Sequence, residues 1–137
     1  MQHEELTRKI IGCAMAVHSA LGNGFQEVIY QRALVIELTD CGLNFSREHE
    51  MDIFYKDQKV GNRRVDFFVE EKVMVEIKAL IKLEDVHLAQ AMNYIQAYEL
   101  EIGLLINFGS RSLEFKRIHN NKKSGKSFNP ANQGSEI

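Results

Sequence analysis

Three ionisable residues stand inside two strongly apolar segments of the sequence. Asp66 interrupts a Val-Asp-Phe-Phe-Val segment, and Glu76 and Lys78 interrupt a Val-Met-Val-Glu-Ile-Lys-Ala segment. Charged groups in buried strands carry a large desolvation cost unless they have partners. Because side chains alternate across a strand, Glu76 and Lys78 share one face. The two segments therefore predict a polar cluster within a mostly buried pair of strands.

The loop between these strands decides whether Asp66 joins that face. If residues 70–72 form a three-residue loop, Val69 pairs with Val73 and Asp66 falls opposite Glu76. Cross-strand partners have Cβ atoms about 4.5–5.5 Å apart, and like charges at that distance repel. A divalent cation such as Mg²⁺ or Mn²⁺ reverses the sign of the interaction, because it prefers oxygen ligands. The alternative is a solvated, salt-bridged sheet face, and a shorter loop would separate the two acids.

The segments that must position these residues alternate between helical and strand patterns. Apolar residues three and four apart predict helices over residues 4–21, about 26–40 and 84–99. Strands are predicted over residues 45–55, 59–69, 73–79, 102–108 and 113–118. Short loops favour an antiparallel meander for the first three strands, and the third helix implies a parallel crossover. The fold class is therefore α/β, a mixed sheet flanked by helices in the order α-α-β-β-β-α-β-β.

Length and composition limit the class of protein. The 137 residues suit one domain, expected over residues 1–119, followed by a polar tail over residues 120–137. No apolar run approaches the roughly 18 residues of a membrane span, and the acidic N-terminus is unlike a secretory signal. We therefore expect a soluble, cytoplasmic protein. Cys13 and Cys41 fit apolar helical positions, with a single disulfide as the alternative.

The charge balance argues against unaided binding to long duplex DNA. The formal net charge is −2, and residues 1–119 carry 14 basic and 18 acidic side chains. Phosphate contacts are made mainly by Lys and Arg. Carboxylates gathered around a metal ion would offset part of the acidic excess. A nucleic-acid function would still favour a homodimer or a partner protein.

The spacing Asp66-x9-Glu76-x-Lys78 on adjacent strands resembles the PD-(D/E)XK nuclease superfamily, with Val65 at the position of the proline. Residues 24–30 fit Gly-x-x-Glu-x-x-Tyr at every fixed position and resemble the GxxExxY family, a compact branch of that superfamily. Residues 87–94 and 103–109 are similar to the same family, and the likeness runs from about residue 4 to 118. The resemblance implies a restriction-endonuclease-like fold.

The resemblance also implies roles for the core residues. Asp66 and Glu76 would hold one or two Mg²⁺ or Mn²⁺ ions, with Glu27 joining them from the second helix. Lys78 would position or deprotonate the attacking water, or stabilise the transition state. For Glu27, stabilisation of the positive end of the helix dipole is a sufficient alternative. Tyr30 shares its face and could bind a phosphate or orient Glu27, or it could be a core aromatic residue with a satisfied hydroxyl.

Flanking residues complete the expected site. Gln90 and Tyr94 stand four apart on one helix face, and they resemble the Gln-x-x-x-Tyr element of RecB-type nucleases, which would orient substrate. His87, one turn earlier, is equally consistent with an ordinary polar stripe. Alternation places Arg64, rather than Arg63, on the face of Asp66, where it could hold a phosphate; surface solvation is the competing explanation.

The sequence thus predicts a metal-dependent nuclease-type domain that hydrolyses phosphodiester bonds, with DNA favoured over RNA. A module with the same fold could instead bind nucleic acid or a nucleotide without turnover. A third reading is an assembly subunit whose first helix forms a dimer seam. The joint presence of Asp, Glu and Lys favours the enzyme, because a relaxed site usually loses one of them.

Overall fold

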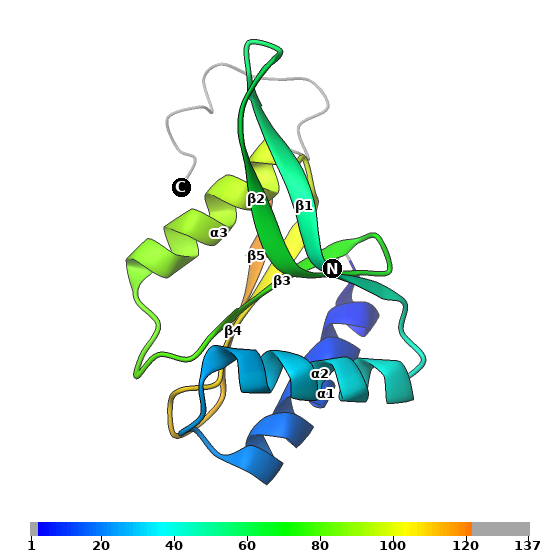
Figure 1. Cartoon of the computed structure of the whole chain (residues 1–137), viewed down its shortest axis with the longest axis vertical. Coiled ribbons are helices and arrows are strands. Elements are labelled where there is room, and N and C mark those ends of the chain that lie inside the picture. The colour runs from blue at the N-terminus through cyan, green and yellow to red at the C-terminus, as the bar shows by residue number, and fades with distance from the viewer. Residues whose placement is uncertain (1–2, 122–137) are drawn as a thin grey trace.

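The computed structural model describes residues 3–121, and its elements follow the predicted order (Figure 1). The helices are α1 (Glu4–Leu21), α2 (Glu27–Asp40) and α3 (Asp85–Ala97). The strands are β1 (Phe45–Tyr55), β2 (Gln58–Val69), β3 (Val73–Lys78), β4 (Ile102–Asn107) and β5 (Glu114–His119). Each predicted boundary lies within about two residues of the observed one.

One five-stranded sheet joins all the strands in sequence order. β1–β2, β2–β3 and β4–β5 are antiparallel pairs, whereas β3 and β4 are parallel. The parallel pair follows from α3, which carries the chain back so that β4 starts beside the first residue of β3. The fold is therefore the predicted mixed α/β sheet with flanking helices.

The sheet separates two apolar clusters. α1 and α2 pack with the larger cluster, which includes Phe67, Val75 and Leu104. α3 packs with a smaller cluster that contains Met74 and Ile95, and Figure 1 shows it apart from the α1–α2 pair. The close approach of α3 depends on a glycine, because a Cβ at Gly103 would lie 2.9 Å from Cγ2 of Ile95.

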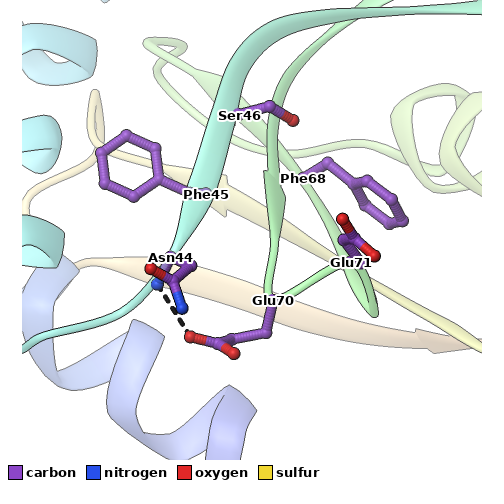
Figure 2. Close-up of a pocket in the computed structure, with 6 residues that line it drawn as sticks. All are labelled: Asn44, Phe45, Ser46, Phe68, Glu70 and Glu71. Atoms are coloured by element: carbon purple, nitrogen blue, oxygen red, sulfur yellow. Dashed lines mark hydrogen bonds between the residues drawn. The ribbon is translucent and has the colours of Figure 1, made fainter.

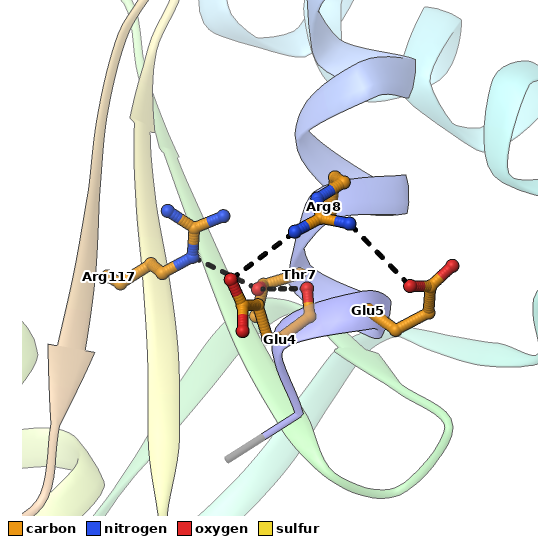
Figure 3. Close-up of polar contacts among 5 residues, drawn as sticks. All are labelled: Glu4, Glu5, Thr7, Arg8 and Arg117. Atoms are coloured by element: carbon orange, nitrogen blue, oxygen red, sulfur yellow. Dashed lines mark hydrogen bonds and ion pairs between the residues drawn. The ribbon is translucent and has the colours of Figure 1, made fainter. Parts of the chain in front are cut away.

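A buried polar contact fixes α1 against the sheet. Thr7 is fully buried, and its hydroxyl donates to the carbonyl of Glu4 at 3.0 Å while accepting from Nε of Arg117 at 3.0 Å (Figure 3). Arg8 forms exposed ion pairs with Glu4 and Glu5 at 3.3 and 3.7 Å. Such surface pairs contribute at most about 1 kcal/mol each, so the buried contact between Thr7 and Arg117 is the stronger of these polar contacts at the start of α1.

The loop between β2 and β3 has the length that the predicted register requires. Val69 pairs with Val73, and Glu70 and Glu71 adopt left-handed φ angles of 54°. The Glu70 carboxylate accepts from the backbone N–H of Asn44 at 2.7 Å, and the Glu70 N–H donates to the Asn44 carbonyl at 2.8 Å (Figure 2). These bonds connect the residue before β1 to the loop, so the role of Glu70 is structural.

The side chains of the β1–β2 hairpin exchange sheet faces at Glu48 and Asp66. Phe67 belongs to the α1–α2 cluster and Val65 to the α3 cluster, although simple alternation would place both on one face. The register is the same on both sides of the break, but Glu48 and Asp66 do not pair, and Glu48 has a φ of 53°. Beyond this point, residues 49–65 continue as a two-stranded arm whose outer end extends past the rest of the fold (Figure 1).

The two cysteines meet where α1 contacts the end of α2. Their Sγ atoms are 3.3 Å apart, and both are free thiols. Burial raises the pKa of Cys13 to about 12. Cys13 is buried, as the helical pattern predicts, whereas Cys41 is exposed because it follows the last residue of α2.

Contacts with the folded part continue past the predicted domain boundary at residue 119. Asn120 is buried, and its Nδ2 donates to the carbonyls of Ile95 and Leu100 at 3.1 and 2.7 Å. The predicted polar tail, apart from its first two residues, lies outside the described part of the chain. Within residues 3–121, the helices include no segment with the length and apolar character of a membrane span.

Candidate functional site

Asp66 lies where β2 separates from β3. The paired ladder ends at Phe67 and Val75. Oδ2 of Asp66 accepts a hydrogen bond from the backbone N–H of Ile77 at 2.7 Å, so the carboxylate takes the place of a backbone acceptor. The predicted register is confirmed up to Phe67, but the expected direct pairing of Asp66 with Glu76 is wrong, because the side chains of β2 exchange sheet faces at this residue.

Glu76 is buried on the side of the sheet that α3 covers. It is 3% exposed, and its Oε1 accepts from Nη2 of Arg63 at 3.1 Å. The guanidinium of Arg63 lies over the ring of Tyr94, 4.7 Å from its centroid. Within residues 3–121, Oε2 of Glu76 and Nε of Arg63 are buried without a hydrogen-bond partner. The ion pair therefore satisfies only part of each group.

The pKa of each of the three predicted carboxylates is raised, and the charge of Asp66 contributes to the shifts of the other two. Burial raises the pKa of Glu76 to about 7, and the charge of Asp66 adds to this, while Arg63 and Lys78 oppose it. Burial also raises the pKa of Asp66, against the effect of its backbone hydrogen bond and of the same two cations. Glu27 is largely exposed, yet desolvation and the charge of Asp66 raise its pKa as well. The site therefore holds negative charge that its own cations do not fully compensate.

A small pocket separates the end of β3 from α3. Its lining includes Glu76 and Lys78 from β3 and Gln90 and Tyr94 from α3, and it has room for about one water-sized group. The structure thus brings four predicted site residues to one place. Asp66 does not line this pocket; its Oδ1 lies 3.5 Å from Nε2 of Gln31, a residue of α2.

His87 also lines the pocket, but one of its ring nitrogens is used by the fold. Nδ1 of His87 accepts from the backbone N–H of Glu84 at 3.0 Å. Glu84 is the residue before α3, so this bond caps the helix N-terminus. This contact is consistent with the alternative that His87 is an ordinary polar residue of the helix surface.

Lys78 is the last residue of β3 and is partly buried. Its ammonium group makes no hydrogen bond or direct ion pair with another group of residues 3–121. Asn107 pairs with it across the parallel ladder and is fully buried. The Asn107 amide bonds both the N–H and the carbonyl of Leu80, at 2.7 and 2.9 Å. Asn107 therefore fixes the backbone just after Lys78.

Sequence reasoning missed Asn107 and also Gln31 of α2. Gln31 is 8% exposed, its Nε2 lies 3.5 Å from Oδ1 of Asp66, and its Oε1 accepts from Nη2 of Arg47 at 3.1 Å. Gln31 stands four residues after Glu27, so helical spacing could have indicated it. For Asn107 the available signal was a polar residue that closes an otherwise apolar strand.

Tyr30 serves the fold rather than a phosphate. It is fully buried, and its hydroxyl donates to the carbonyl of Gly22 at 2.6 Å and accepts from the N–H of Phe25 at 3.1 Å. Its ring stacks on Phe108 with centroids 4.7 Å apart. The expected substrate contact of Tyr30 is therefore corrected to the alternative of a core aromatic residue with a satisfied hydroxyl.

The side chain of Arg64 does not lie beside Asp66, contrary to the prediction. Its side chain is 59% exposed and lies 3.7 Å from Glu48 and 3.8 Å from Glu50 on the arm. The exchange of sheet faces in the hairpin reverses the alternation on which that expectation depended, so Arg63 is the arginine that reaches the buried carboxylate.

The donor set fits a partial divalent-cation site. No group of three His, Cys, Asp or Glu side chains in residues 3–121 forms a ready cage for a metal ion. Mg²⁺ is usually held by one or two carboxylates, with waters and phosphate oxygens completing the shell. Among the described residues, Oε2 of Glu76 is a buried oxygen without a partner, and Oδ1 of Asp66 has only the long contact with Gln31. These two carboxylates match such a site.

Comparisons with known proteins agree with this geometry. A family model described as the PD-(D/E)XK nuclease superfamily matches residues 4–118. The crystal structure of SSO0001 has a similar fold, with a TM-score of 0.56 and 19% identity over 87% of this chain. This chain spans 60% of the length of that neighbour. A search of curated proteins gave no match.

Proposed function

Since the chain belongs to the PD-(D/E)XK nuclease superfamily, we propose that it hydrolyses phosphodiester bonds in nucleic acid, with DNA preferred to RNA. One observation carries this proposal: among residues 3–121, an oxygen of Glu76 is buried without a partner, and Lys78, whose ammonium group makes no ion pair there, lines the same pocket. If Glu76 and Lys78 had only a structural role, we would expect both charged groups to be fully hydrogen-bonded. The motif of residues 24–30 supports a place in the GxxExxY branch.

A divalent cation, Mg²⁺ or Mn²⁺, would supply positive charge for the phosphate oxygens and acidify the attacking water. Asp66 and Glu76 would hold it through Oδ1 and Oε2, the oxygens that the fold uses least. Glu27 interacts electrostatically with Asp66 from the start of α2 and would add a third carboxylate. Lys78 would donate a hydrogen bond to the attacking water or to a phosphate oxygen.

Residues of α3 would position the substrate. Gln90 and Tyr94 line the pocket with Glu76 and Lys78, so a nucleotide entering the site would pass this helix face. Gln90 is exposed, and its amide makes no hydrogen bond to another group of residues 3–121. The amide is therefore free to bond a base or a phosphate.

A partner or a second copy of the chain would supply part of the nucleic-acid surface. Residues 1–119 carry 18 acidic and 14 basic side chains, whereas affinity for nucleic acid depends mainly on Lys and Arg. If the catalytic proposal fails, the same imbalance favours an assembly subunit that works with a partner over a free-standing nuclease.

A cleavage assay tests the proposed activity. The protein is incubated with single-stranded and double-stranded DNA and RNA, in Mg²⁺, in Mn²⁺ and in EDTA. We expect cation-dependent cleavage of DNA that EDTA abolishes. A cation that binds the folded state also raises the melting temperature. Intact substrates together with an unchanged melting temperature in Mn²⁺ would overturn the proposal.

The Glu76 carboxyl should make the metal-free protein lose stability as the pH rises. Its pKa is raised from 4.5 to about 7 by burial, so the folded state binds this proton more tightly than the unfolded chain. The stabilisation is complete below about pH 4.5 and is lost as the pH rises through about 7. Glu76→Gln lacks this equilibrium, so its melting temperature in EDTA should rise relative to wild type between about pH 5 and pH 8. A constant difference over this range would contradict the raised pKa.

A further inference from the structure

In the metal-free protein, the carboxylate of Glu76 forms an ion pair with the guanidinium of Arg63. Nη2 of Arg63 lies 3.1 Å from Oε1 of Glu76, whose side chain is only 5% exposed. The side chain of Arg63 is 34% exposed. The guanidinium therefore reaches a buried carboxylate while a third of the Arg63 side chain stays exposed.

The contacts of Arg63 are incomplete on the side of Glu76 and well made elsewhere. Its Nε and the second oxygen of Glu76 are buried without partners within residues 3–121. Its Nη1 donates to the carbonyl of Arg64 at 3.2 Å, and its guanidinium lies over the ring of Tyr94. An arginine selected to neutralise this carboxylate permanently would form a two-point pair, which is its strongest geometry. The single-point contact is weaker and easier to exchange.

The net charge of the site would change sign when a divalent cation binds. Glu27, Asp66 and Glu76 face Arg63 and Lys78, which leaves one excess negative charge when all three acids are ionised. A divalent ion would turn this into one excess positive charge if Arg63 stayed. A guanidinium and a divalent ion on the same carboxylate would repel each other across a few ångströms of poorly screened space.

We propose that Arg63 is the counterion of the metal-free site and leaves Glu76 when a divalent cation binds. This inference rests on the proposed function. The released guanidinium remains beside Tyr94, since the cation–π contact does not depend on Glu76. There its planar fork matches the oxygens of a substrate phosphate. Arg63 thus neutralises Glu76 in the metal-free site and contacts the substrate phosphate once the cation is bound.

Competition predicts that removing Arg63 strengthens cation binding. Arg63→Met keeps an apolar stem against Tyr94 and removes the charge. The hydrogen bond between Arg63 and Glu76 must break before the cation binds, so its removal should lower the dissociation constant for Mn²⁺ about tenfold. It is measured by isothermal titration without nucleic acid, at a pH well above the pKa of Glu76. Arg64→Met is the matched control and should bind Mn²⁺ like the wild type, because Arg64 pairs with Glu48 and Glu50.

A second measurement needs no variant that could misfold. In the wild type, the Nε–Hε resonance of the Arg63 side chain is followed by NMR during a titration with Mg²⁺. It should shift with the same saturation curve as the backbone amide of Glu76. If Mg²⁺ moves the Glu76 amide but leaves the Arg63 resonance unchanged, Arg63 stays in place and the inference is wrong. Unchanged or weaker Mn²⁺ binding by a folded Arg63→Met protein would also overturn it.

These outcomes separate the inference from the proposed function. If the wild type binds neither cation, the metal site itself is absent and the proposed function fails. If the wild type binds Mn²⁺, Glu76→Gln binds it poorly and Arg63→Met binds it like the wild type, only the inference about Arg63 fails.

Discussion

Replacing Glu76 by Gln should lower the rate of cation-dependent cleavage about 10²-fold or more while the fold is retained. Gln has nearly the same shape, so the apolar surroundings on the α3 side need not rearrange. It cannot supply the charged oxygen that would bind the cation, although its carbonyl can still accept from Arg63. The measurement is the single-turnover cleavage rate in Mn²⁺, together with the melting temperature of the variant in EDTA.

A matched control is available on the arm. Glu50 is exposed and lies 3.8 Å from Arg64, so Glu50→Gln removes an equal charge outside the site and should cleave like the wild type. Lys78→Met should lose cleavage as Glu76→Gln does, yet bind Mn²⁺ at least as tightly as the wild type. Equal cleavage by wild type, Glu76→Gln and Lys78→Met would remove Glu76 and Lys78 from the reaction.

Gly109→Ala should lower the free energy of unfolding by about 3 kcal/mol, at the upper end for an overpacked site. A Cβ at this position would lie 2.5 Å from the backbone N and O atoms of Leu80 and 2.6 Å from the carbonyl carbon of Ala79. Backbone atoms cannot move aside as the end of a flexible side chain can. The chain leaving β3 would have to shift, although Asn107 holds it through two hydrogen bonds.

Chemical denaturation of the wild type and two alanine variants measures this effect. Gly61→Ala, in β2, is the control, because a Cβ there would meet no atom within 4 Å. It should change stability little. Since Gly109 follows the strand beside Lys78, a surviving Gly109→Ala protein should also cleave poorly. Equal stability of the two variants would show that the Ala79–Leu80 backbone yields easily.

The order of helices and strands could be predicted from the sequence because each segment has a single consistent pattern of apolar residues. Residues 102–107 form an apolar run and became the buried strand β4, and the loop at residues 70–72 set the register of Val69 with Val73. Helical spacing brought Gln90 and Tyr94 to the same pocket as Glu76. These features depend on local periodicity and loop length, which one chain displays directly.

The details that were missed depend on departures from periodicity. Alternation favoured Arg64, but the exchange of sheet faces at Glu48 and Asp66 brought Arg63 to Glu76 instead. Nothing in the residue types marks that break, since Glu48 adopts a left-handed φ without being glycine, and strong β formers surround Asp66. The hydroxyl of Tyr30 was likewise assigned to substrate, because sequence spacing cannot show that the carbonyl of Gly22 lies within reach.

The bond between Asp66 and the N–H of Ile77 has an evolutionary consequence. On the proposed function, two separate selective pressures would act on this one side chain, since the end of β3 needs an acceptor there whether or not any chemistry occurs. A descendant that lost hydrolysis would still be under pressure to keep Asp, or Asn, at this position. The side chain of Lys78 has no comparable bond within residues 3–121, so it is free to drift once catalysis is no longer selected. Among descendants of such a chain, loss of the lysine would mark the end of enzymatic activity sooner than loss of the aspartate.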